Sequence, residues 1–284
     1  MMAGTALGLM ALAAGLQAAD LPSFEAASVK PAGLGTPQSM RGGPGTGDPG
    51  QFTYSGAPMS RLLMVAYSVK AYQLFGPEWM TTGKFDIVAK VPAGATRQQL
   101  NLMLRNLLAE RFGLEVHHES RELTGYELTI SKEGLKLKPV PEIASSDAAG
   151  LKARLDALLP GKNEGMPVFW DRSTGIGNIK LTNGLARSVG VAQPMATLVT
   201  QCENRSGLPI VDKTGLTGRY DYSFDYAPDP PANQPDAAAT ATAMDPGADF
   251  VSAFQKQLGL KLEKKKVPID VLVIDRVNRV PVEN

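Results

Sequence analysis

The alternation of apolar and polar residues divides the chain into helical and extended segments. Apolar side chains recur with a period of about 3.6 residues over 100–112 and over 250–258, which predicts two amphipathic helices. Thr96 is followed three residues later by a glutamine, the pattern of a capping box at the start of the first helix. Apolar and aromatic runs over 85–91 and 220–226 are typical of strands.

The same succession of features occurs twice along the chain. Proline, methionine and leucine share their spacing in 58–63 and 194–199, where each proline would begin a helix. The pattern glycine, cation, aromatic residue, aspartate follows in 83–86 and in 218–221. We therefore predict an α+β fold built from two tandem copies of a strand-helix-strand-strand-helix-strand-strand unit, with mixed or antiparallel sheets. The alternative is a chance match between two ordinary α+β stretches.

The copies and the segments around them give the expected domain organisation. The predicted segments are a signal peptide over 1–19, an N-terminal strand and Gly/Pro-rich mobile loop over 20–50, the first unit over 51–138, a connecting segment over 139–180 with a helix at 151–159, and the second unit over 181–284 with a disordered insertion near 229–245. The predicted strands are 24–29, which could join either sheet, then 51–56, 72–74, 85–91, 114–116 and 126–130, and finally 181–191, 209–211, 220–226, 260–262 and 271–274.

The N-terminal residues and the charge balance bear on compartment and partner. Residues 1–19 carry no charged side chain, are rich in leucine and end in small residues. This run is shorter than the roughly 20 residues of a membrane-spanning helix, so it favours a secretory signal peptide over a buried helix. We expect export to the periplasm or the extracellular space, without stable membrane insertion after cleavage. The formal net charge of +1 argues against a nucleic-acid partner.

Groups suited to catalysis or metal binding are few. Cys202 is the only cysteine, so no intramolecular disulfide can form, and we expect a buried, inert thiol. The only histidines, His117 and His118, are adjacent and would point to opposite faces of a strand, which disfavours a shared metal ion. No Gly-x-Ser-x-Gly nucleophile motif occurs. The lysines at 264–266 suggest a solvated edge strand, or alternatively contact with an acidic partner. We predict no catalytic residue, no metal and no cofactor.

Four residues stand out as binding candidates. Asp86 and Asp221 could form a pair of acid/base carboxylates, but each recurs at the same place in its copy. We therefore expect their side chains first to accept hydrogen bonds from the N–H groups of the adjacent turn. Trp79 and Trp170 are the best candidates for an aromatic contact surface, with burial as the alternative.

Six motifs resemble those of a known family. They are FEAASVKP at 24–31, LLMVAY at 62–67, YQLFGPEW at 72–79, KFDIVAK at 84–90, LLAERF at 107–112 and VDKTGLTGRYD at 211–221. Together they are similar to domain of unknown function 3738, a secreted family abundant in soil acidobacteria. The resemblance covers nearly the whole chain after the predicted signal and implies export and a shared fold. Some relatives carry this domain behind a membrane metallopeptidase sensor of the β-lactam-receptor type. The family brings no established activity and no catalytic residues.

These features together favour an exported, non-catalytic binding or sensory module whose partner is an unknown protein or small molecule. One alternative is an uncharacterised hydrolase that depends on carboxylates. Another is a structural or assembly protein of the cell envelope, whose edge strands pair with another chain.

Overall fold

In the described part of the chain the strands form three mixed or antiparallel sheets, and helices pack against them. This confirms the predicted α+β class. A computed structural model describes residues 22–33, 35–144, 147–159, 167–171, 175–181, 184–228 and 250–282. The predicted signal peptide and the predicted insertion near 229–245 lie outside the described residues. Contacts divide the chain into unit 1, which runs to Glu119 and resumes at Val271, and unit 2, which covers Ser120–Asp270.

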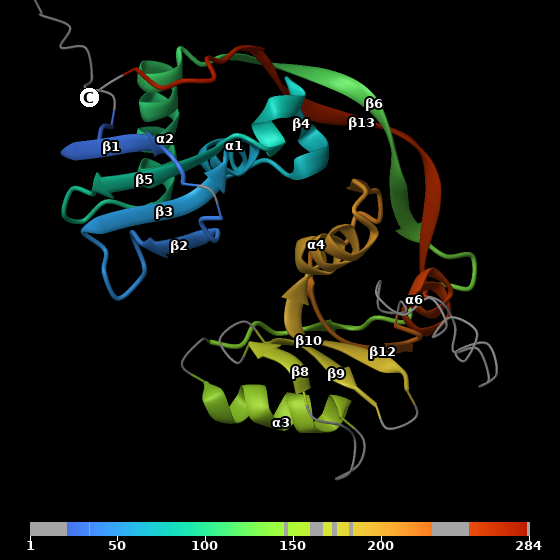
Figure 1. Ribbon diagram of the computed structural model, residues 1–284. Coiled ribbons are helices and arrows are strands. Elements are labelled where there is room, and N and C mark those ends of the chain that lie inside the picture. The colour runs from blue at the N-terminus through green and yellow to red at the C-terminus, as the bar shows by residue number, and fades with distance from the viewer. Residues whose placement is uncertain are drawn as a thin grey trace, which may run out of the picture. The chain divides into compact units, whose positions relative to one another are not determined.

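Unit 1 contains a four-stranded antiparallel sheet in the order β1-β5-β3-β2, with helices α1 and α2 packed on one face (Figure 1). The predicted N-terminal strand therefore joins this sheet, next to β5. The elements are β1 (Ala26–Pro31), β2 (Ser39–Gly42), β3 (Gln51–Pro58), α1 (Met59–Tyr67), the 3-10 turn η1 (Ala71–Gln73), β4 (Leu74–Phe75), the 3-10 turn η2 (Glu78–Thr81), β5 (Lys84–Lys90) and α2 (Arg97–Phe112).

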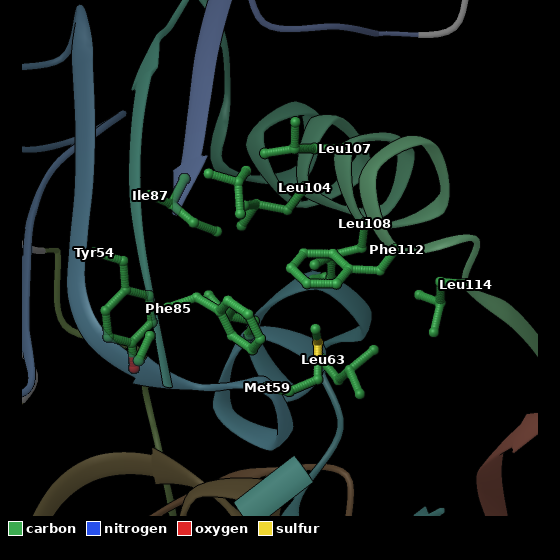
Figure 2. Packing of buried hydrophobic residues seen from close by; sticks show 14 of the residues in the cluster. Tyr54, Met59, Leu63, Phe85, Ile87, Leu104, Leu107, Leu108, Phe112 and Leu114 are labelled. Carbon is green, nitrogen blue, oxygen red and sulfur yellow. The ribbon is translucent and has the colours of Figure 1, made fainter. Parts of the chain in front are cut away.

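Helix α2 has the predicted boundaries and fills the core of unit 1. The hydroxyl of Thr96 accepts from the Gln99 N–H while the Gln99 side chain accepts from the Thr96 N–H, which confirms the capping box. Gly113 ends the helix at φ 57°, as a left-handed C-cap. The apolar stripe of α2 points toward β5, and the rings of Phe112 and Phe85 meet edge to face at 4.9 Å (Figure 2). Each large side chain buried here contributes about 1.5–3 kcal/mol.

Unit 2 contains a five-stranded sheet in the order β7-β12-β10-β9-β8. Helices α4 and α6 pack on the face with Tyr222 and Phe224, while the opposite face, with Val189, packs against α3 (Figure 1). The elements are β7 (Pro139–Val140), α3 (Ala148–Leu158), β8 (Pro167–Asp171), β9 (Ile176–Lys180), β10 (Ala186–Pro194), α4 (Met195–Ser206), β11 (Ile210–Asp212), β12 (Arg219–Tyr226) and α6 (Phe250–Leu258).

The two longest strands, β6 (Glu115–Ile130) and β13 (Leu260–Arg276), each have residues in both units. They lie in a sheet of order β11-β6-β13-β4, in which β11 runs parallel to β6 and β4 runs parallel to β13. The prediction of two separate strands after each helix was therefore wrong. Neither long strand contains a Gly/Asn turn pattern that would divide it. Gly125 inside β6 allows close packing, because a Cβ at this position would lie 2.5 Å from the Pro209 carbonyl oxygen.

An equivalent order of elements occurs in both halves of the sequence. The first half has β3-α1-β4-β5-α2-β6 and the second has β10-α4-β11-β12-α6-β13, with each proline as N-cap and not as first helical residue. Each short strand pairs with the long strand of the other half, β4 with β13 and β11 with β6. A gene duplication would explain this order and stays a prediction.

Several predicted strand boundaries were wrong because the chain turns at positions where the sequence pattern predicted a strand or a loop. The strand expected over 181–191 begins only at Ala186, since Leu181 closes a turn in which its N–H donates to the Leu185 carbonyl. The expected loop before β3 contains β2, because the Gly43 N–H donates to the carbonyls of Asp48 and Gln51 and folds the chain back. The connecting segment contains β7, β8 and β9 as well as the predicted helix, observed as α3.

Candidate functional site

Asp86 holds a β-bulge in the neighbouring strand of unit 1. The register between β3 and β5 shifts between Tyr54 and Ala57, and Gly56 adopts φ 56° there. The Gly56 N–H donates to Asp86 Oδ1 at 2.7 Å, so the carboxylate takes the place of the lost ladder partner. This confirms that Asp86 accepts a backbone N–H, although the donor lies in the bulge and not in the turn before Asp86.

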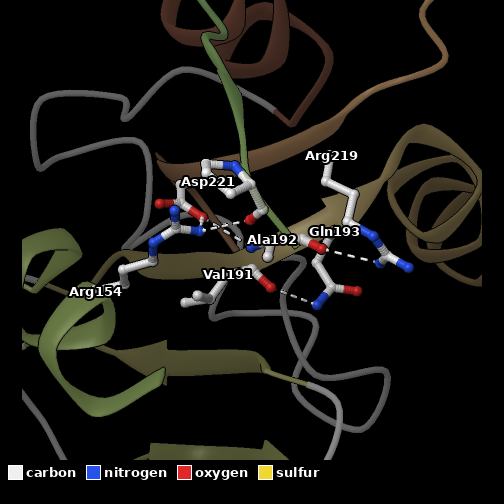
Figure 3. Close-up of polar contacts among 7 residues, drawn as sticks. Arg154, Val191, Ala192, Gln193, Arg219 and Asp221 are labelled. Carbon is white, nitrogen blue, oxygen red and sulfur yellow. Dashed lines mark hydrogen bonds and ion pairs between the residues drawn. The ribbon is translucent and has the colours of Figure 1, made fainter. Parts of the chain in front are cut away.

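Asp221 makes the same contact in unit 2. The register between β10 and β12 shifts between Gly190 and Gln193, and the intervening Ala192 has φ 51°. The Ala192 N–H donates to Asp221 Oδ1 at 2.7 Å (Figure 3). A positive φ is unfavourable for alanine by about 1–2 kcal/mol, so neighbouring contacts must hold this conformation.

Two arginines reinforce the bulge of β10 (Figure 3). Arg219 Nη1 donates to the Ala192 carbonyl at 3.1 Å, and the same guanidinium forms an ion pair with Glu142. Arg154, on α3, places Nη1 3.5 Å from Asp221 Oδ1 and also donates to a backbone carbonyl at the end of β7. Both backbone polar groups of Ala192 therefore have charged partners, which makes this cluster a structural support for the bulge.

Sequence reasoning missed Ala192 and Arg154. A glycine at 192 would have signalled a bulge, but alanine carries no such signal. The available clue was positional, because Gly56 and Ala192 each stand two residues before the proline that caps the next helix. Arg154 lies on the connecting helix, where a charged residue is expected to face solvent, and only the fold brings it to Asp221.

The two tryptophans give different outcomes. Trp79 is half-buried against the core of unit 1, and a Cβ on Gly83 would lie 2.9 Å from its ring. The Arg279 guanidinium lies 5.8 Å from the Trp79 ring centroid. Trp79 therefore packs within its unit and presents only part of its ring to solvent. Trp170 lies on β8, and its side chain is outside the described part of the structure.

A cavity of about 160 Å³ opens between α4 and α6 in unit 2, and we call it the Arg205 cavity. Its apolar wall comes from Ile210, Phe250, Val251 and Leu262, and its polar lining from Tyr126, Cys202, Arg205 and Ser206. The Arg205 guanidinium lies 4.4 Å from the ring centroid of Tyr226 and 5.0 Å from that of Phe250.

Cys202 is only 2% exposed at this cavity. Burial, aided by the nearby Glu203 carboxylate, raises the pKa of the Cys202 thiol to about 12. The expected burial of the thiol is therefore confirmed. A thiol with this pKa carries almost no thiolate at neutral pH, which supports the prediction that Cys202 is inert.

The histidines lie on β6, where His117 Nδ1 is 2.9 Å from both carboxylate oxygens of Asp275. Within the described ranges, no group of three or more His, Cys, Asp or Glu side chains is placed to hold a metal ion. The lysine run on β13 is solvent-exposed as predicted. Strand β4 pairs with β13 at Leu272 and Val273, away from the lysines, so the predicted edge position of the run at 264–266 is not contradicted by the sheet order β11-β6-β13-β4. Lys265 forms a 2.7 Å ion pair with Glu127.

Comparison with known families gives one match. The sequence matches the family described as "Protein of unknown function (DUF3738)" over residues 60–277. No curated protein and no solved structure matches it significantly. Every helix within the described residues is too short or too polar to cross a membrane.

Proposed function

The chain belongs to the family of proteins of unknown function DUF3738, and from this premise we propose that it is an exported, non-catalytic binding or sensory module. The observation that carries the proposal is the shared role of its two candidate carboxylates. One carboxylate oxygen of Asp86 and one of Asp221 each accept a hydrogen bond of 2.7 Å from the N–H of a bulge residue.

This role conflicts with acid/base catalysis by the same groups. A catalytic carboxylate must direct an oxygen toward the substrate and exchange a proton during turnover. Protonation of Asp221 would weaken both its bond to the Ala192 N–H and its attraction to Arg154, so each turnover would loosen the bulge. The proposal of a carboxylate-dependent hydrolase therefore ranks second.

Binding also has a physical basis in unit 2. The Arg205 cavity combines an apolar wall with one cation, as small-molecule sites commonly combine apolar surface with few polar groups. Export rests on the uncharged leader expected over 1–19. N-terminal sequencing of protein recovered from the culture medium and periplasm would test it, with cleavage near Asp20 as the expected result and an intact leader as the contrary one.

A paired screen tests the non-catalytic assignment. Wild type, Asp86→Asn and Asp221→Asn would be incubated with chromogenic glycosides, esters and peptides, and the melting temperature of each variant would be measured alongside. We expect no turnover by wild type or by either variant, and we expect at least one small molecule in a parallel thermal-shift panel to raise the melting temperature. Turnover that is lost in Asp221→Asn while its fold and melting temperature are kept would overturn the proposal.

A further inference from the structure

We infer that the Arg205 cavity of unit 2 binds a small molecule that joins a compact apolar body to a single carboxylate group. The inference rests on the proposed binding function and gives it a site and a ligand class. It follows from the size of the cavity, the chemistry of its wall and the position of its charge.

The cavity size and wall fit a ring or a short branched chain. Its volume of about 160 Å³ is close to the ~150 Å³ of engineered apolar cavities that bind benzene. Phe250, Val251 and Leu262 form an apolar wall, which favours a ligand body without polar atoms. The volume leaves little room for a sugar or a peptide.

The charge of the cavity favours an anion. Among the described residues that line it, Arg205 is the only one with a formal charge at neutral pH. Contacts with the Tyr226 and Phe250 rings, whose centroids lie 4.4 Å and 5.0 Å away, help to hold its guanidinium in place. The planar fork of N–H groups on a guanidinium matches the two oxygens of a carboxylate.

Two hydroxyl-bearing residues lie on the same lining. The Ser206 hydroxyl already interacts with the backbone of Leu208, whose N–H lies 3.2 Å from it. Tyr126 lies on β6 beside β11.

A single fixed cation suits a monoanion better than a phosphate dianion, which commonly needs several cations or N–H groups.

Benzoate is the probe of choice because it combines a six-membered ring with one carboxylate. Titration of the full chain by calorimetry, with benzyl alcohol and benzylamine as size-matched neutral and cationic probes, measures the charge preference. Methyl chemical shifts of Ile210 and Val251 in NMR spectra locate the bound probe. We expect benzoate to bind at least about tenfold tighter than either analogue, a difference of ~1.4 kcal/mol, and to shift both methyl signals.

Three variants separate site binding from loss of fold. Val251→Phe fills the cavity, and Val88→Phe makes the same change at a 46%-exposed position of unit 1 as the matched control. Arg205→Gln removes the charge, and Arg205→Lys keeps it without the planar fork. Benzoate affinity is expected to fall at least tenfold in Val251→Phe and Arg205→Gln, to fall less in Arg205→Lys, and to be unchanged in Val88→Phe.

The outcomes are distinguishable from failure of the proposed function. Equal binding of benzoate and benzyl alcohol, binding unaffected by Val251→Phe, or no binding at millimolar benzoate would each overturn the assignment of this cavity. The binding-module proposal would still stand if another small molecule raised the melting temperature. If Arg205→Gln does not fold, the Val251→Phe comparison and the methyl shifts decide the question.

Discussion

Replacing Asp221 by alanine should destabilise unit 2 far more than an ordinary surface substitution. The side chain of Asp221 is 20% exposed and accepts the Ala192 N–H at 2.7 Å. A hydrogen bond to a charged group contributes about 1.5–3 kcal/mol, and the partly exposed ion pair to Arg154 adds at most about 1 kcal/mol. We therefore expect Asp221→Ala to lower the free energy of unfolding by about 2–4 kcal/mol.

The asparagine variant separates shape from charge. Asp221→Asn keeps an acceptor oxygen for the Ala192 N–H and loses only the charge, so a decrease of about 1–2 kcal/mol is expected. Asp156→Ala is the matched control in the same unit, because its side chain is 59% exposed and its ion pair with Lys152 contributes less than about 1 kcal/mol.

Urea unfolding followed by circular dichroism would measure these differences. For a chain of this size each kcal/mol corresponds to roughly 2–4 °C in melting temperature. Asp221→Ala should melt roughly 4–16 °C below wild type. The melting temperature of Asp221→Asn should lie between those of wild type and Asp221→Ala. If Asp221→Ala stays within about 0.5 kcal/mol of wild type, like a neutral surface change, the structural role of this carboxylate is refuted.

Three further changes test other parts of the account. Gly56→Ala should destabilise unit 1 by about 2–3 kcal/mol in urea unfolding, because its φ is 56° and a Cβ would lie 2.7 Å from the Thr36 carbonyl oxygen; a neutral effect would contradict the bulge geometry. Stability should fall as the pH rises from 9 to 12, since the Cys202 thiol ionises near 9.0 in the unfolded chain but only at about 12 in the fold. This loss is on the order of 4 kcal/mol. Cys202→Ala should reduce the slope and leave a contribution of the same sign from Tyr222, whose pKa is also raised by burial; an unchanged slope would count against burial of the thiol. Thr96→Ala should cost about 1 kcal/mol through loss of the helix cap, and an unchanged melting temperature would show that the capping box is not formed in solution.

Local patterns allowed parts of the fold to be predicted from the sequence. The capping box at Thr96, the helix stop at Gly113 and the existence of strands β5 and β12 depend on neighbours in the chain, and all three were predicted. The continuous strands β6 and β13 were not, because their middle sections are polar and show no period that separates a strand from a loop.

The site was harder to predict because its contacts join distant segments. The repeat of aspartate after a glycine, a cation and an aromatic residue indicated a structural role, but the bulge that receives each carboxylate lies 29 or 30 residues earlier. The Arg205 cavity gave no sequence signal, because a cation near the end of a helix is commonly solvent-exposed. Only the fold brings the ring of Tyr226 on β12 and the ring of Phe250 on α6 to Arg205.

Amide hydrogen exchange at Gly56 and Ala192 tests most directly whether these aspartates support the fold. In wild type both amides should exchange slowly. Asp86→Ala should accelerate exchange at Gly56 alone, and Asp221→Ala at Ala192 alone, because each carboxylate accepts one N–H in its own unit. Rapid exchange of both amides in wild type, or unchanged exchange in the variants, would contradict the structural role and return both carboxylates to the list of possible catalytic groups.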